Sequence, residues 1–254
     1  MIRRRGSGPP LLVINGLAAT KEDWDPIFIE GLAGMNELLL LDNRGMGASV
    51  DDGSSFTIAD LAADCARVIV AELDRPTAVL GWSLGGFIAQ ALALDHPQHV
   101  TKLVLLSSDP GGPDSYGDPA VIEGLIDTSP PPAEQARRLL ALLFGDELGP
   151  ALYDQFGDVV ASARARLRQD LLDRQRCALD DWHRAGVADR LAHISVPTLV
   201  ATGTADRVIS AANSLKLATA IPGAWLLQFH DGGHAFMAQH PAALSKIINE
   251  FLAL

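Results

Sequence analysis

Runs of consecutive apolar residues recur along the chain, each bounded by glycine, proline or a charged residue. Short apolar runs with such boundaries are typical of strands that are buried on both faces of a parallel sheet. The predicted strands cover residues 11–15, 38–42, 77–82, 102–107, 198–202 and 225–230.

Longer amphipathic stretches lie between these runs and predict helices over residues 24–33, 58–73, 84–96, 211–220 and 241–253. Strands that alternate with helices indicate an α/β protein with a doubly wound, mostly parallel sheet. In such sheets the chemistry lies in the loops beyond the carboxyl ends of the strands. The candidate site residues are therefore those that directly follow each apolar run.

One long segment interrupts the alternation. No strand-like run occurs between Ser108 and Pro197, although the segment is rich in helix-forming residues. We expect a core made of residues 1–108 and 197–254, with a helical insertion over 109–196. Arginines in the second half of the insertion are expected to form a solvated face, with an anion-binding role as the alternative: Arg164, Arg166, Arg168, Arg174 and Arg176.

The charge balance of the chain bears on which kinds of partner it can bind. Lys and Arg total 20 against 31 Asp and Glu, so the formal net charge is −11. This balance argues against nucleic acid and anionic membranes as partners, because both demand a surplus of positive charge. The two cysteines, Cys65 and Cys177, show neither metal-ligand spacing nor a disulfide framework, so no metal site is predicted. The apolar runs are shorter than the roughly 20 residues of a spanning helix, and a cytoplasmic location is expected.

The strongest chemical signal is the sequence Gly81-Trp82-Ser83-Leu84-Gly85, which joins the predicted strand 77–82 to the predicted helix 84–96. A serine between two glycines in a strand-to-helix turn is typical of a nucleophile elbow, where side chains on either flank would collide with the neighbouring backbone. Ser83 is the candidate nucleophile. An ordinary glycine-rich turn is the alternative.

A serine hydroxyl needs an imidazole to take its proton and a carboxylate to orient that imidazole. His234 follows the last predicted strand in the loop Asp231-Gly232-Gly233-His234 and is the candidate base. Asp206 follows the strand 198–202 and is the candidate acid. Asp109 follows the strand 102–107 and is the competing acid, although a helix cap or a hinge also explains it.

Acyl transfer also needs two amides that bind the oxyanion. One is expected from Leu84, at the start of the helix after the nucleophile. The other is expected from Leu17 in the loop after the strand 11–15, with a simple tight turn as the alternative reading of that loop.

Together these motifs resemble the α/β-hydrolase family. The resemblance rests on Gly8-Pro9-Pro10-Leu11-Leu12-Val13-Ile14-Asn15-Gly16, Asp42-Asn43-Arg44-Gly45-Met46-Gly47, Gly81-Trp82-Ser83-Leu84-Gly85-Gly86, Asp206 and Gly233-His234. It implies the α/β-hydrolase fold, with a helical lid that the family places after its sixth strand. Many members have His-Gly where this chain has Asn15-Gly16. Residues 1–5 can form one short strand, so a shortened N-terminal hairpin is expected.

The resemblance implies a serine hydrolase that acts on a small carboxylic ester or lactone without a cofactor, most similar to enzymes of the 3-oxoadipate enol-lactonase kind. The alternatives are a cofactor-free perhydrolase or haloperoxidase, a carbon–carbon bond hydrolase on the same triad, and a non-catalytic ligand-binding homologue. The pocket is expected to be apolar and to contain Trp82, Phe144, Phe156 and Trp182. The sequence leaves open whether the chain forms a homo-oligomer.

Overall fold

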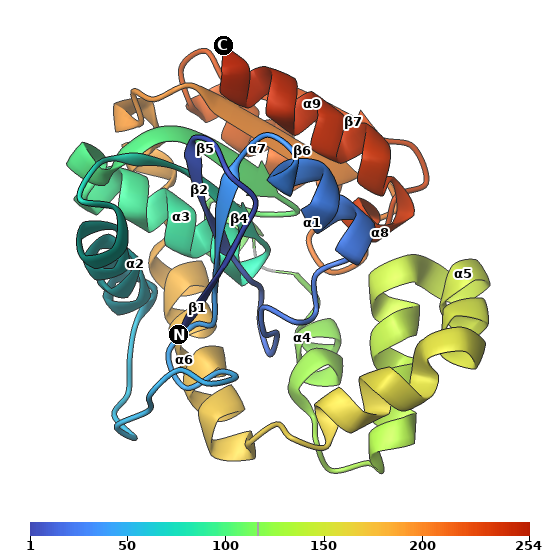
Figure 1. Ribbon diagram of the computed structural model, residues 1–254. Helices are drawn as coiled ribbons and strands as arrows, with labels where there is room; N and C mark the ends of the chain where they lie inside the picture. The colour runs from blue at the N-terminus through green and yellow to red at the C-terminus, as the bar shows by residue number, and fades with distance from the viewer. Residues whose placement is uncertain (116) are drawn as a thin grey trace.

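A seven-stranded sheet forms the centre of the computed structural model, which describes residues 1–115 and 117–254 (Figure 1). The order across the sheet is β1-β3-β2-β4-β5-β6-β7, with β1 antiparallel to β3 and every other pair parallel. The strands are β1 (Ile2–Arg5), β2 (Pro10–Ile14), β3 (Glu37–Leu41), β4 (Thr77–Trp82), β5 (Val100–Leu106), β6 (Thr198–Gly203) and β7 (Trp225–Phe229).

The central strands are apolar on both faces because helices cover both sides of the sheet. In β2, Leu12 and Ile14 face one hydrophobic layer, and Leu11 and Val13 face the other. The first layer holds α2 (Ile58–Leu73), α3 (Leu84–Asp95) and α7 (Ala211–Ala220), and the second holds α1 (Pro26–Ala33), α8 (Phe236–Gln239) and α9 (Pro241–Ala253). This is the predicted doubly wound arrangement, and each predicted strand matches an observed one to within about two residues.

The segment 109–196 is mainly helical and follows β5, which is the fifth strand of this chain and not a sixth. It contains α4 (Pro119–Ile126), α5 (Pro132–Arg164) and α6 (Gln169–Ala185). Short 3-10 turns cover Pro97–His99, Pro113–Ser115 and Ala188–His193. In α5, Gly145 has a φ of 81°, a left-handed conformation that divides the helix in two. In Figure 1, α4 and α5 form a lobe beside the sheet, whereas α6 lies close to α2.

The arginines of this segment do not all face solvent. Arg164 is only 4% exposed, and its Nε donates to Gln135 Oε1 at 3.1 Å. Burial lowers the pKa of this guanidinium from its usual value. The expectation of a solvated face is therefore wrong for Arg164, because α5 ends at this residue and turns its side chain inward.

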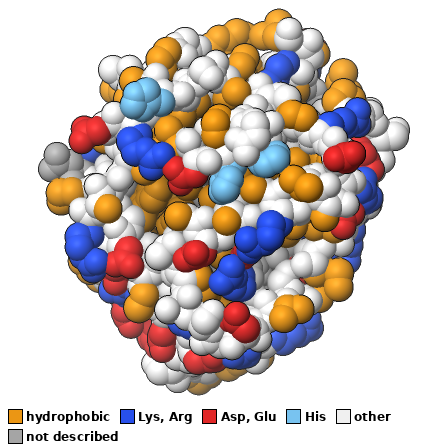
Figure 2. All heavy atoms as spheres, turned by 90° about the vertical axis from the view of Figure 1, so that its left-hand side faces the viewer, with side chains coloured by type: hydrophobic (Ala, Val, Ile, Leu, Met, Phe, Trp, Pro, Cys, Tyr) orange, Lys and Arg blue, Asp and Glu red, His pale blue; other side chains and the backbone are white. Residues whose placement is uncertain are grey.

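The outer surface mixes charges of both signs. Figure 2 shows acidic and basic side chains interspersed over one face. Two of the ion pairs that connect distant segments join Arg44 to Asp64 and Arg190 to Asp95. In the described part of the chain, none of the helices combines the length and the apolar character that a membrane crossing requires.

Candidate active site

Ser83 lies in a strained turn between β4 and α3. Its φ of 56° and ψ of −122° are conformations that a residue with a side chain rarely adopts. A Cβ atom on Gly81 would overlap the carbonyl oxygen of Gly85, and one on Gly85 would overlap that of Ile14. The two glycines let the strand, the turn and the helix approach closely, and this leaves the Ser83 side chain at the carboxyl end of the sheet.

His234 and Asp206 form a buried pair beyond the ends of β6 and β7. The Nδ1 atom of His234 lies 2.9 Å from Asp206 Oδ2 and 3.1 Å from Oδ1, and the two side chains are 2% and 0% exposed. Asp206 Oδ1 also accepts hydrogen bonds from the amides of Val208 and Ile209, both at 2.9 Å. These two donors fix the carboxylate in place.

The pairing assigns the proton on the His234 ring. A carboxylate only accepts hydrogen bonds, so in the neutral imidazole Nδ1 carries the proton and Nε2 keeps a lone pair. In the part of the chain that the structure describes, no protein group hydrogen-bonds to this Nε2. His234 therefore has the form that a general base requires.

Trp82 connects this pair to the nucleophile elbow. Its ring centroid lies 5.4 Å from that of His234, and its Nε1 donates to the carbonyl oxygen of His234 at 3.0 Å. Since Trp82 directly precedes Ser83, the contact holds the histidine loop against the end of β4.

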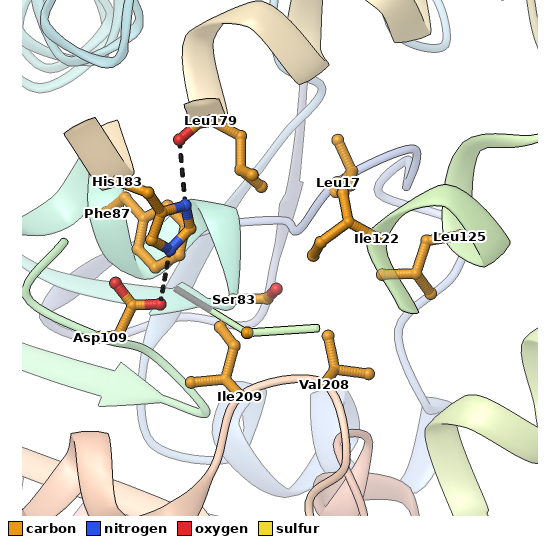
Figure 3. A pocket seen from close by; sticks show the side chains of 11 residues that line it. Leu17, Ser83, Phe87, Asp109, Ile122, Leu125, Leu179, His183, Val208 and Ile209 are labelled. Carbon is orange, nitrogen blue, oxygen red and sulfur yellow. Dashed lines mark hydrogen bonds and ion pairs between the residues drawn. The ribbon is translucent and has the colours of Figure 1, made fainter. Parts of the chain in front are cut away.

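A second carboxylate–imidazole pair, Asp109 and His183, was not predicted from the sequence. His183 Nε2 lies 3.1 Å from Asp109 Oδ2, and its Nδ1 lies 3.0 Å from the carbonyl oxygen of Leu179 (Figure 3). Asp109 Oδ1 accepts from the Gly111 amide at 2.7 Å and from Trp182 Nε1 at 3.3 Å. The helical spacing of Leu179, Trp182 and His183 is the sequence signal that places this histidine on a buried face.

Both ring nitrogens of His183 face oxygen atoms, so neither is free to take a proton from Ser83. His234 has one nitrogen held and one free. This difference separates the two pairs chemically, and it favours Asp206 over Asp109 as the acid that orients a catalytic base.

A small cavity lies beside Ser83 (Figure 3). Its free volume of about 10 Å³ is close to that of one water molecule. Its walls come from α3, α4 and α6 and from the loops that follow β2, β5 and β6. The lining residues are Leu17, Ser83, Phe87, Asp109, Gly117, Ile122, Leu125, Leu179, His183, Val208 and Ile209.

Two amides without protein acceptors flank Ser83. The hydrogen bonds found for residues 1–115 and 117–254 use neither the Leu84 amide, at the first position of α3, nor the Leu17 amide. A Cβ atom on Gly16 would lie 3.3 Å from the Cβ of Ser83, so the loop that carries Leu17 runs alongside the nucleophile. An oxyanion hole requires two such donors beside the nucleophile.

A model of the alpha/beta hydrolase fold family matches residues 9–241. The chain belongs to the alpha/beta hydrolase fold family. A 2-hydroxy-6-oxononadienedioate/2-hydroxy-6-oxononatrienedioate hydrolase of Cupriavidus pinatubonensis is 28% identical to it, over 99% of this chain and 86% of the relative. A pimeloyl-(acyl-carrier protein) methyl ester esterase of Aromatoleum aromaticum is 32% identical, over 72% of this chain and 76% of the relative.

Among solved structures, a hydrolase from Pseudomonas aeruginosa superposes with a TM-score of 0.83 at 28% identity, over 100% of this chain and 94% of that one. The family match and the hydrolase relatives support hydrolase activity for this chain. These relatives do not separately support the expected membership in the 3-oxoadipate enol-lactonase branch of the family.

The aromatic residues expected in the pocket of this alpha/beta hydrolase lie elsewhere. Trp182 stacks on Phe87 with ring centroids 5.3 Å apart, so Phe87 stands between it and the cavity. Phe144 lies on α5 beside the histidine loop, its Cα 3.2 Å from where a Cβ of Gly233 would be. Trp82 packs between Trp24 and His234.

Phe156 is 51% exposed on α5 and is not among the residues that line the cavity. None of the four aromatic residues expected in the pocket lines this cavity, whose wall contains Phe87 and aliphatic side chains of α4, α6 and the loop after β6. Among the described residues, no cluster of three or more His, Cys, Asp or Glu side chains has an arrangement suited to a metal ion.

Proposed function

We propose that this chain is a serine hydrolase that cleaves a small carboxylic ester or lactone through an acyl-enzyme on Ser83. The observation that carries the proposal is the state of His234, whose Nδ1 is held by Asp206 while its Nε2 has no hydrogen-bond partner among residues 1–115 and 117–254. The strained elbow and the two unpaired amides beside Ser83 supply the remaining parts of an acyl-transfer site.

In the acylation step, the Ser83 hydroxyl oxygen attacks the carbonyl carbon of the ester as His234 Nε2 takes the hydroxyl proton. The carbonyl oxygen gains the negative charge and binds the Leu17 and Leu84 amides. The tetrahedral intermediate then expels the alcohol, which receives the proton from His234. In deacylation a water molecule repeats the sequence, with His234 again acting first as base and then as acid, and releases the carboxylic acid.

The cavity walls favour a small, mainly apolar acyl group. Ile122 and Leu125 of α4 and Leu179 of α6 close the space above Ser83. Because the free space beside Ser83 is small, we propose that the segment 109–196 acts as a lid that moves for substrate on the core formed by 1–108 and 197–254.

Carbon–carbon bond hydrolysis on the same residues is the second candidate. It is supported by the relative from Cupriavidus pinatubonensis, which spans nearly the whole chain and is named as a hydrolase of a 2-hydroxy-6-oxo dienoic diacid. The esterase relative from Aromatoleum aromaticum supports the first candidate, and its identity to this chain is higher, although over a shorter stretch.

A substrate screen tests the proposal. Purified protein is assayed with p-nitrophenyl esters of increasing acyl length, with aliphatic lactones and with a 2-hydroxy-6-oxo dienoic acid. We expect turnover of short acyl esters and a loss on the order of 10⁶-fold in kcat for Ser83→Ala. Full ester turnover by Ser83→Ala would overturn the proposal, and turnover confined to the dienoic acid would favour the second candidate.

A further inference from the structure

A glutamine of the helical segment holds the loop that carries one of the unpaired amides. The backbone amide of Ala18 donates to Oε1 of Gln175 on α6 at 3.0 Å. Gln175 is 1% exposed and lies 157 positions from Ala18 along the chain. The bond therefore joins the core to the segment 109–196 at the residue that directly follows Leu17.

The position of this bond matters because of the backbone conformation around it. Ala18 has a φ of 55°, a left-handed conformation that is unfavourable for a residue with a Cβ atom. The start of the loop is fixed by Asn43 Nδ2, which donates to the Asn15 carbonyl oxygen at 3.1 Å, and Asn15 Nδ2 donates to the Thr20 carbonyl oxygen. Gln175 provides the restraint between these two ends.

The same bond fixes the direction of the Leu17 amide. The Ala18 N–H belongs to the peptide plane that joins Leu17 to Ala18, so an acceptor at this point restrains ψ of Leu17 and φ of Ala18. The Asn15 carbonyl oxygen, which accepts from Asn43, belongs to the peptide between Asn15 and Gly16. The peptide between Gly16 and Leu17 therefore lies between two restrained peptides and has little freedom to rotate. The N–H of that peptide is the donor that we place in the oxyanion hole.

The chemistry of the Gln175 amide supports a specific role. Only an oxygen can accept from the Ala18 N–H, so Oε1 occupies that position and Nε2 takes the other. Nε2 is buried and has no hydrogen-bond partner among the described residues. An unpaired buried donor is a cost to stability, which a side chain retained only for packing would avoid. The acceptor oxygen is the part of Gln175 that the structure uses.

We propose that Gln175 is a positioning residue for the oxyanion hole, which it sets through the Ala18 amide. This inference rests on the proposed function. It means that α6 does more than cover the cavity, since the oxyanion loop reaches its geometry only when α6 is docked on the core.

Two substitutions remove the bond by different means. Gln175→Met keeps the length of the side chain and deletes the acceptor, and Gln175→Asn keeps the amide but is one methylene too short to reach Ala18. Deleting an oxyanion donor outright costs about 10²–10³-fold in kcat. Since the donor remains but is less well held, we expect both variants to lose about 10-fold to 100-fold in kcat while KM changes less than about threefold.

Arg174→Met is the matched control. Arg174 is the preceding residue of α6 and also anchors this helix to the core, through two bonds of 2.7 Å to the Asp51 carboxylate. It makes no contact with the oxyanion loop that the structure describes. If Gln175 acted only by docking α6, Arg174→Met would lower kcat as much as Gln175→Met. We expect it to keep kcat within about threefold of the wild type.

Binding of a trifluoromethyl ketone, whose adduct with Ser83 places an oxyanion in the hole, gives a second readout. Its inhibition constant is expected to rise in the two Gln175 variants in proportion to the loss in kcat/KM, and to stay unchanged in Arg174→Met. Unchanged kcat in both Gln175 variants, or an equal loss in Arg174→Met, would overturn this inference alone. A wild-type protein that forms no acyl-enzyme on Ser83 would overturn the proposed function, and the inference with it.

Discussion

Replacing each acid of the two carboxylate–imidazole pairs by asparagine separates their roles. In Asp206→Asn, the Val208 and Ile209 amides both donate to the position of Oδ1, so the amide oxygen of the new side chain takes that place. Its NH2 group then takes the place of Oδ2, 2.9 Å from His234 Nδ1. Nδ1 must accept this hydrogen bond, which moves the ring proton to Nε2.

An imidazole with its proton on Nε2 cannot take the proton of Ser83. The corresponding change in a serine protease triad lowers kcat by about 10⁴-fold, equivalent to about 5.4 kcal/mol of transition-state stabilisation. We expect a loss of the same order in kcat for Asp206→Asn, with KM nearly unchanged because the variant alters the base rather than the cavity.

Asp109→Asn provides the control. The Gly111 amide and Trp182 Nε1 donate to the position of Oδ1, so the new NH2 group faces His183 Nε2. His183 can then donate from Nδ1 to the Leu179 carbonyl oxygen and accept at Nε2, which leaves every polar group paired. We expect this variant to fold and to keep kcat within about tenfold of the wild type.

Steady-state kinetics on a short p-nitrophenyl ester, with thermal unfolding of each variant as a check on folding, measures both effects. Asp109→Ala, which removes the carboxylate partner of His183 Nε2, of the Gly111 amide and of Trp182 Nε1, is expected to lose about 3–5 kcal/mol of unfolding free energy. The reasoning is refuted if Asp109→Asn loses more kcat than Asp206→Asn, or if Asp206→Asn retains more than about a tenth of the wild-type kcat.

Three further predictions concern the elbow, an ion pair and the thiols. Gly81→Ala places a methyl group against the backbone carbonyl of Gly85, which cannot move away. We expect the free energy of unfolding in urea to fall by more than about 3 kcal/mol. Wild-type stability in this variant would contradict the close packing. The hydrogen bonds from Arg174 hold the pKa of the Asp51 carboxyl well below its usual value, so the pair stabilises the fold above about pH 4 and loses this contribution as the pH falls further. The stability difference between wild type and Arg174→Met should accordingly shrink in acid, and a difference independent of pH would exclude the pair as its cause. Burial raises the pKa of the Cys65 thiol, whereas Cys177 is exposed. A disulfide reagent should therefore react rapidly with Cys177 alone until the protein is unfolded. Rapid reaction of both thiols in the folded protein would contradict this burial.

The sheet and the elbow could be predicted from the sequence because their signals are local. Apolar runs of strand length form buried strands wherever helices cover both faces, and Gly81 and Gly85 report the close approach of the chain around Ser83. His234 and Asp206 are found by the rule that chemistry follows strand ends, and the structure brings them together.

The contacts of α6 could not be predicted, because they depend on how that helix docks. His183 and Asp109 are 74 positions apart, and Gln175 lies still further from Ala18. No local pattern specifies which loop a buried polar side chain will meet. For the same reason the sequence could not specify which side chains of the segment 109–196 line the cavity beside Ser83, and Phe156, for example, is 51% exposed and does not line it.

Labelling with a fluorophosphonate tests the central claim, that His234 and Asp206 activate Ser83 as a nucleophile. The wild-type protein is reacted with the fluorophosphonate and then digested with a protease. Mass spectrometry of the peptides should find one adduct, on Ser83 in the peptide that contains Gly81–Gly85. The adduct should be absent in Ser83→Ala and form far more slowly in His234→Ala. An adduct on another residue, or equally fast labelling of Ser83 in His234→Ala, would contradict the account.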